Sequence, residues 1–157
     1  MSSKAGTLSP GLAWVFGILA GGVAFGATWG LAKAGIYSRP VQYAVFALVF
    51  LGFGFASTYL TKASLGMSIA ASAVGALVVA GLTYWQLTSG IGAVSAAGAK
   101  IASAATGAAD LGAAVKSAGS FLSTFAIIPV AIVFGIGLAA GISGNIAGKK
   151  FAAPKQA

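Results

Sequence analysis

The chain has 157 residues, of which 59% are hydrophobic and 6% are charged, and its formal net charge at pH 7 is +8. About a quarter of the residues of an average soluble domain are charged, so this composition excludes an ordinary soluble domain and indicates an integral membrane protein. The basic residues avoid the middle of the long apolar runs, so we expect anionic lipids among the partners and no nucleic acid.

The first predicted transmembrane helix covers residues 11–35, which at about 1.5 Å per residue is enough to cross a hydrocarbon core of about 30 Å. The first 30 residues, with Lys4 in a polar start before an apolar centre, also have the layout of a signal peptide, but we expect an uncleaved helix. Glycines recur in it at four-residue spacing and therefore share helix faces. Each costs about 1 kcal/mol of helix propensity, and in lipid such positions allow a second helix to approach closely. The predicted packing positions are Gly17, Gly21, Gly22, Gly26 and Gly30.

Two further spans are predicted at residues 41–60 and 65–87. Phenylalanines give the second span a bulky surface, whereas the third has Gly75 four residues after Ala71, again a small-residue face. The connection at residues 61–64 is too short to reach elsewhere. We therefore expect these two spans to be antiparallel neighbours.

Residues 88–120 are dominated by Ala, Gly and Ser. Lys100, Asp110 and Lys116 would each cost about 2.5–3.5 kcal/mol at the bilayer centre, which argues against another span. We predict an interfacial amphipathic helical segment at about 91–118, or a short helical hairpin broken near Gly107. Its apolar face is thin, so it suits another protein surface, with Asp110, Lys100 and Lys116 as candidates for intermolecular contacts. Asp110 is the only acid, and we expect it to be a surface or helix-capping residue, with an intermolecular salt bridge as the alternative.

The last predicted span covers residues 121–146 and contains Pro129, which we expect to kink it. The proline frees the carbonyl of Phe125, for which the hydroxyl of Thr124 is the expected substitute donor. After the proline the glycine faces return. The packing positions predicted here are Gly137, Gly141, Gly144 and Gly148.

Together these elements predict an all-α fold, with residues 1–157 forming a single transmembrane helical domain of four spans. Four spans place both termini on one side of the membrane. The basic residues divide five against four between the two sides, and this small bias favours termini on the cytoplasm-like side. The expected location is a bacterial cytoplasmic membrane or an organellar inner membrane.

The residues needed for most catalytic chemistry are missing. The sequence has no His, Cys or Glu and one Asp, so it offers no metal or haem ligand set and no paired acid–base groups. We therefore expect no enzyme activity. Gln42, Gln86 or Asn145 could ligate a pigment magnesium or bind a quinone, but hydrogen bonding between helices is their commoner role. Lipid or pigment in the helix grooves is the remaining cofactor expectation.

Two resemblances to known families concern the helix grooves. The segment GIGLAAGISGNIAGK, residues 135–149, resembles the glycine-rich helix of rotary ATPase proteolipids, whose doubled form also has four spans. That family would imply proton carriage on a carboxylate within a span, and no span here contains one. The layout also resembles a mitochondrial inner-membrane family that includes protein translocase subunits and an accessory subunit of respiratory complex I. The arginine and aspartate of that family's motif are not found here.

The function expected from these observations is that of a non-catalytic accessory subunit. It would pack against other integral membrane subunits of a larger complex, in a respiratory or photosynthetic energy-transducing membrane. The alternative is a self-assembling pore or holin-like permeability protein, because small residues favour homo-oligomers equally. A small transporter would need interrupted helices in corresponding halves, and only Pro129 interrupts a span.

Overall fold

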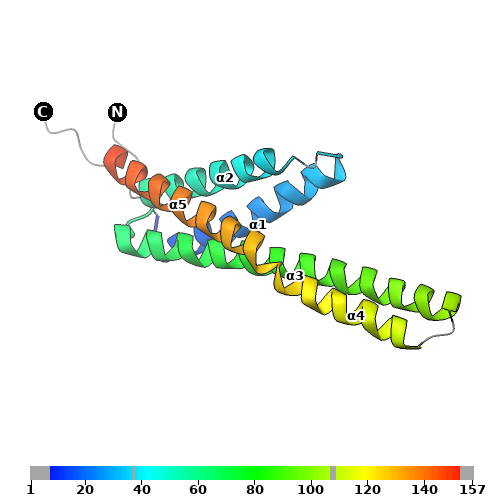
Figure 1. Cartoon of the computed structure of the whole chain (residues 1–157). Coiled ribbons are helices and arrows are strands. Elements are labelled where there is room, and N and C mark those ends of the chain that lie inside the picture. The colour runs from blue at the N-terminus through cyan, green and yellow to red at the C-terminus, as the bar shows by residue number, and fades with distance from the viewer. Residues whose placement is uncertain (1–7, 37, 107–108, 153–157) are drawn as a thin grey trace, which may run out of the picture. The chain divides into compact units, whose positions relative to one another are not determined.

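The structure is a computed structural model that describes residues 8–36, 38–106 and 109–152. Within these ranges the elements are α1 (Leu12–Lys33), α2 (Arg39–Leu60), α3 (Leu65–Thr106), α4 (Ala109–Thr124) and α5 (Ile127–Ala152) (Figure 1). Four helical stretches are long and apolar enough to cross a membrane: Leu12–Lys33, Arg39–Leu60, Leu65–Ile101 and Ala113–Ala152. The predicted all-helical fold with four such stretches is confirmed, and insertion into a membrane stays a prediction.

The first two helices lie close to their predicted bounds because a glycine follows the first and a proline lies at the start of the second. After α1, Gly35 adopts a φ of 81°, a left-handed conformation that only glycine takes at low cost and that commonly ends helices. Pro40 lies in the first turn of α2, where its missing N–H leaves no bond unmade.

The third helix differs from the prediction, because α3 has 42 residues and runs to Thr106 instead of ending near residue 87. Alanine is the strongest helix former, and no proline interrupts this stretch. The predicted segment at 91–118 is therefore built from the end of α3 and the start of α4. This agrees with the hairpin alternative, although Gly107, near which the break was predicted, lies outside the described residues. Placement of this segment at a membrane interface stays a prediction.

The chain forms two compact units. The first comprises Met1–Ala80 and Ile132–Ala157, and we call it the four-helix unit because α1, α2 and parts of α3 and α5 build it. The second, Gly81–Ala131, is called the hairpin unit, after the rest of α3 and the antiparallel α4. Whether the two act as one domain stays a prediction.

In the four-helix unit, the N-terminal ends of α1 and α3 lie at the same end as the C-terminal ends of α2 and α5 (Figure 1), and we call this the shared end. Leu8 pairs with the α2–α3 connection at this end: its N–H donates to the carbonyl of Leu60 at 2.9 Å, and its carbonyl accepts from Lys62 at 3.1 Å. The core is built from small side chains around a few large ones. Its buried members are Ala20, Ala24, Phe46, Phe50, Ala76, Val79 and Val133.

Large apolar side chains also cover the outside of this unit. Leu48 of α2 is 68% exposed and Leu77 of α3 is 59% exposed, and both lie within their candidate spans. Apolar patches of this extent are unusual on water-soluble monomers. An apolar exterior around a small-residue core is the arrangement expected of helices that face lipid.

The core makes a first prediction through Phe50, which is 1% exposed. Phe50→Ala should lower the free energy of unfolding by about 2 kcal/mol, because the vacated volume loses dispersion contacts even where lipid removes the hydrophobic term. Leu48→Ala removes a large side chain from the exposed surface of the same helix and should change stability by less than about 0.5 kcal/mol. Reversible unfolding in mixed detergent micelles measures both, and equal losses would contradict this core.

Candidate functional site

The candidate site of this protein is its set of helix-packing faces, and the first lies between α1 and α3. A side-chain carbon added at Gly17 would clash with the backbone of Ala71, and one added at Gly75 would clash with the carbonyl of Gly17. At Gly21 an added carbon would lie 2.5 Å from the carbonyl oxygen of Gly75. These predicted packing glycines therefore bring the two backbones into direct contact.

A second close crossing joins α2 and α5. A carbon added at Gly54 would lie 2.5 Å from the carbonyl oxygen of Gly141, and additions at Gly144 or Gly148 would meet the α2 backbone near Leu51 and Phe55. Gly141, Gly144 and Gly148 were among the predicted packing positions. Gly54 was not, because along α2 it has no glycine one turn away.

The ring of Phe50 fills the space between the two crossings. A carbon added at Gly75 of α3 would lie 3.3 Å from this ring, and one added at Gly137 of α5 would lie 3.2 Å from it. Glycines on two neighbouring helices therefore make room for one aromatic ring of α2. Gly137 and Gly141 thus pack against side chains, whereas Gly144 and Gly148 meet the α2 backbone.

A different arrangement holds for the second glycine series of α1. Gly22, Gly26 and Gly30 are exposed, and carbons added at these positions would meet nothing within 4 Å. We call these three residues the open stripe. They lie on the side of α1 away from Gly17 and Gly21, so the described helices use one glycine face of α1 and leave the other uncovered.

A layer of buried polar groups joins the helices near the shared end of the four-helix unit. Asn145 of α5 is 0% exposed, and its Nδ2 donates to the hydroxyl of Ser72 on α3 at 2.9 Å. The hydroxyl of Thr58 on α2 donates to the carbonyl of Asn145 at 3.0 Å. Asn145 therefore links three helices, as its predicted role in hydrogen bonding between helices requires.

Three more buried oxygen atoms in this unit have no hydrogen-bond partner among the described protein atoms: Ser57 Oγ, Ser68 Oγ and Asn145 Oδ1. Buried polar atoms are normally satisfied by protein or ordered water. Sequence reasoning did not single out Ser57, because serines are common in helices that pack closely.

Pro129 lies in the first turn of α5, since α4 ends at Thr124 and α5 begins at Ile127. The carbonyl of Phe125 accepts from the N–H of Ile128 at 3.2 Å, while the hydroxyl of Thr124 donates to the carbonyl of Ser120 at 3.5 Å. The expected substitute donor was therefore wrong: a backbone N–H serves Phe125, because the helix is interrupted before the proline. The predicted kink becomes a helix boundary.

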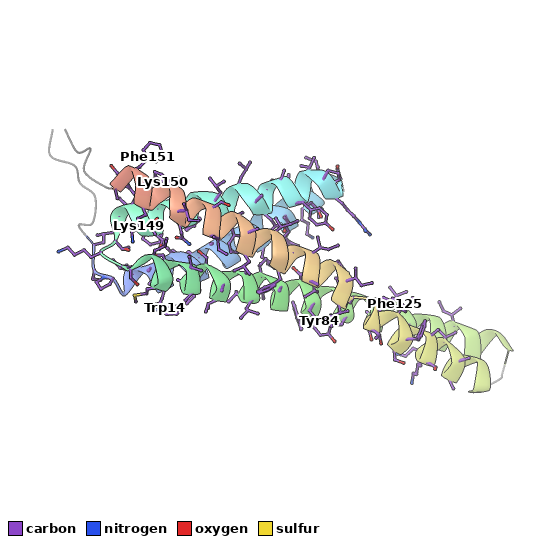
Figure 2. All side chains as sticks on the ribbon, turned by 60° about the vertical axis from the view of Figure 1, so that its left-hand side comes forward. Trp14, Tyr84, Phe125, Lys149, Lys150 and Phe151 are labelled. Carbon is purple, nitrogen blue, oxygen red and sulfur yellow. The ribbon has the colours of Figure 1, made fainter. Side chains whose placement is uncertain are left out.

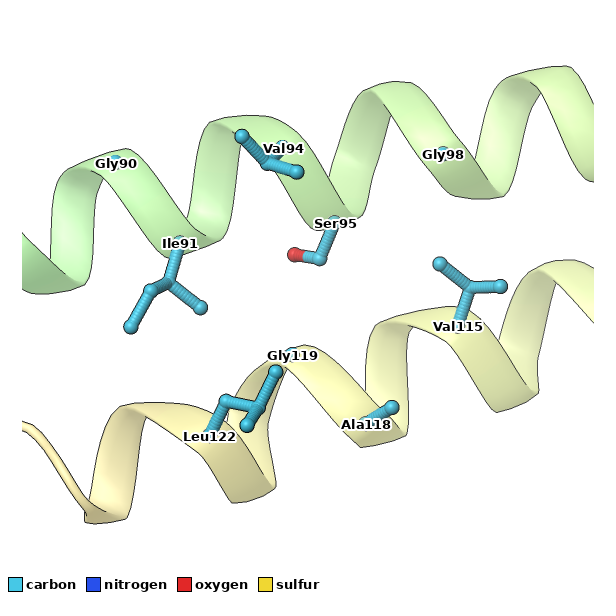
Figure 3. A pocket seen from close by; sticks show the side chains of 9 residues that line it. All are labelled: Gly90, Ile91, Val94, Ser95, Gly98, Val115, Ala118, Gly119 and Leu122. Carbon is cyan, nitrogen blue, oxygen red and sulfur yellow. The ribbon is translucent and has the colours of Figure 1, made fainter.

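The hairpin unit has an apolar groove along the seam between α3 and α4, with a volume of about 460 Å³. Ile91 and Ser95 of α3 point toward α4, and Val115 and Leu122 point back (Figure 3). Close approach again depends on glycine, since carbons added at Gly98 and Gly119 would meet Val115 and Ser95.

The charged residues predicted for intermolecular contacts are spread over this hairpin. Lys116 is exposed on α4 and borders a more polar hollow that Ser120 and Ser123 also line. Lys100 is exposed on α3. Asp110 belongs to the first turn of α4, a position that favours an acid electrostatically, but its side chain lies outside the described part of the structure.

Among the described residues, no group of three or more His, Cys, Asp or Glu could hold a metal ion. The packing faces described above consist of glycine backbone, small side chains and a few hydroxyl and amide groups. Comparison of the chain with protein families, curated proteins and solved structures gives no match.

The packing faces make a second prediction. Gly54→Ala should destabilise the folded chain by about 1–3 kcal/mol, because the new methyl group forces α2 and α5 apart. Gly22→Ala places the same methyl group in open space and should stabilise by about 0.5–1 kcal/mol through helix propensity. Unfolding in detergent micelles measures both variants. Equal effects at the two positions would contradict the assignment of covered and open faces.

Proposed function

We propose that this protein is a non-catalytic accessory subunit that packs into a larger complex of integral membrane proteins. The proposed setting is an energy-transducing membrane, either respiratory or photosynthetic. In this proposal the chain contributes surfaces and lipid or pigment contacts, and the partner subunits carry the chemistry.

The observation that carries the proposal is the open stripe of Gly22, Gly26 and Gly30. Interior glycines cost helix stability, and the other α1 glycines offset that cost by close contact with α3. The open stripe has no such contact within the described residues. In lipid, a face of this kind is suited to close approach of another transmembrane helix.

The length of α3 supports an additional contact outside the membrane. Its 42 residues amount to about 63 Å of helix at about 1.5 Å per residue, about twice the thickness of a hydrocarbon core. Tyr84 and Trp85 are exposed near its middle, and aromatic rings of this kind favour the membrane surface. We place the interfacial segment after these residues, where Lys100, Asp110 and Lys116 can contact another subunit.

The proposed location is a bacterial cytoplasmic or organellar inner membrane with the termini on the cytoplasm-like side. Lys33 supports placement of the C-terminal end of α1 at a membrane surface, because its ammonium lies 5.3 Å from the ring centre of Trp29. Basic groups at helix ends also favour anionic lipids.

A self-assembling pore remains the second candidate, and one observation favours it. The hollow beside the α3–α4 seam has a volume of about 420 Å³ and carries Thr88, Lys116, Ser120 and Ser123 along one side of the hairpin. Several copies of such a polar side could line an opening. The open stripe would then join identical chains.

Assembly is tested by mild-detergent purification through a tag on the chain, with native mass and identification of every copurifying protein. Wild type should bring down integral membrane partners at fixed stoichiometry. Gly26→Leu should keep the monomer's stability but lose the partners, because the bulky side chain blocks the open stripe. Gly52→Leu is the matched control, since Gly52 is also exposed with nothing within 4 Å of an added carbon.

Three outcomes contradict the proposal. Partners that survive Gly26→Leu would show that the open stripe is not the contact. Equal loss in Gly52→Leu would indicate a general effect of added bulk. A homo-oligomer without other proteins would move the pore to first place.

A further inference from the structure

We infer that the shared end of the four-helix unit holds the headgroup phosphate of an anionic phospholipid between Lys62 and Lys149. A cavity of about 270 Å³ opens there between the last turns of α2 and α5 and the start of the α2–α3 connection. Its lining residues are Thr58, Thr61, Lys62, Ala63, Lys149 and Ala152.

The electrostatics of this cavity favour an anion. Lys62 and Lys149 line it from two different elements. Lys149 and Lys150 both lie in the last turn of α5 (Figure 2). The sequence has one Asp and no Glu, and that Asp, Asp110, belongs to the hairpin unit. The four-helix unit therefore has no acidic side chain to neutralise these lysines.

The walls of the cavity are fixed by hydrogen bonds, so the two lysines start from defined backbone positions. The N–H of Lys62 donates to the carbonyl of Leu8 at 3.1 Å, and the hydroxyl of Thr61 donates to the carbonyl of Ser57 at 2.6 Å while accepting from Ala63 at 3.2 Å. Across the cavity, Thr58 donates to the carbonyl of Asn145. A preorganised site loses less entropy when it binds its ligand.

These bonds also decide what kind of recognition the cavity offers. The backbone N–H groups of Lys62 and Ala63 and the hydroxyls of both threonines already donate within the protein. The lysine ammonium groups are therefore the remaining lining donors suited to an anion. Recognition depends on charge more than on direction, so arginine should replace either lysine without loss.

The surroundings favour a lipid over a soluble phosphate. Phe55 stacks on Tyr59 with ring centres 5.5 Å apart, and Phe151 meets Phe55 edge-on at 5.9 Å, so aromatic rings gather at this end of α2 and α5. Aromatic residues concentrate where a membrane meets water. From there the exposed apolar surface continues along the same helices through Leu51 and Ile146. One ligand with an anionic head and apolar tails matches both surfaces.

This inference rests on the membrane placement proposed above and not on assembly with partners. It is tested on the purified full-length chain by native mass spectrometry in detergent, titrating phosphatidylglycerol and phosphatidylcholine with identical acyl chains. Wild type should retain one phosphatidylglycerol in preference to phosphatidylcholine. The double variant Lys62→Gln with Lys149→Gln should weaken this binding by about twenty-five-fold, about fivefold per lysine.

Two control variants separate a site from general charge. Lys33→Gln with Arg39→Gln removes two positive charges at the α1–α2 connection and should leave binding unchanged. Lys62→Arg with Lys149→Arg should retain it. Equal loss in both glutamine variants, or no preference in wild type, would overturn the inference. Displacement of the lipid by excess inorganic phosphate would overturn it in favour of a soluble anion.

Discussion

Close contact between helix backbones is the constraint on which the four-helix unit depends. In lipid, burial of apolar surface contributes little to the association of helices. Dispersion and short polar contacts must therefore hold the helices together, and both require close approach. Gly17, Gly21 and Gly75 supply it between α1 and α3, while Gly54, Gly141 and Gly144 supply it between α2 and α5. The packing of Phe50 and the hydrogen bonds of Asn145 follow from these two crossings, because larger residues there would separate the groups involved.

The helical class and the four apolar stretches could be predicted from the sequence, because length and composition alone carry that information. The extent of α3 could not. The cost of burying Lys100 at a bilayer centre argues against a span, but it says nothing against a helix that continues beyond the membrane. The effect of Pro129 could not be predicted either, because it depends on where the helix begins. In the structure α4 ends before Pro129, which lies in the first turn of α5. Local rules therefore identified the interruption and misplaced the hydrogen bond that compensates for it.

Spacing identified most of the packing glycines but could not tell which face of a helix a neighbour covers. Gly17 and Gly22 belong to two series that look alike in the sequence, yet α3 covers only the first of them. Gly54 was missed because its partner is Gly141 on another helix, and a pattern along one segment does not show such a pair. The lysine-lined cavity could not be predicted for the same reason, since Lys62 and Lys149 come to line one cavity only when α2 and α5 pack together.

Cysteine labelling in membranes tests the central claim, a bundle packed through glycine contacts and surrounded by lipid. The chain has no cysteine, so Leu48→Cys, Leu77→Cys and Lys62→Cys each introduce a single thiol at a position exposed in the structure. In opened membrane fragments a charged maleimide should label the Lys62 variant and spare the other two, because lipid hinders both the reagent and thiolate formation. Denaturation should then make all three reactive. Rapid labelling at Leu48 and Leu77 before denaturation would contradict the account.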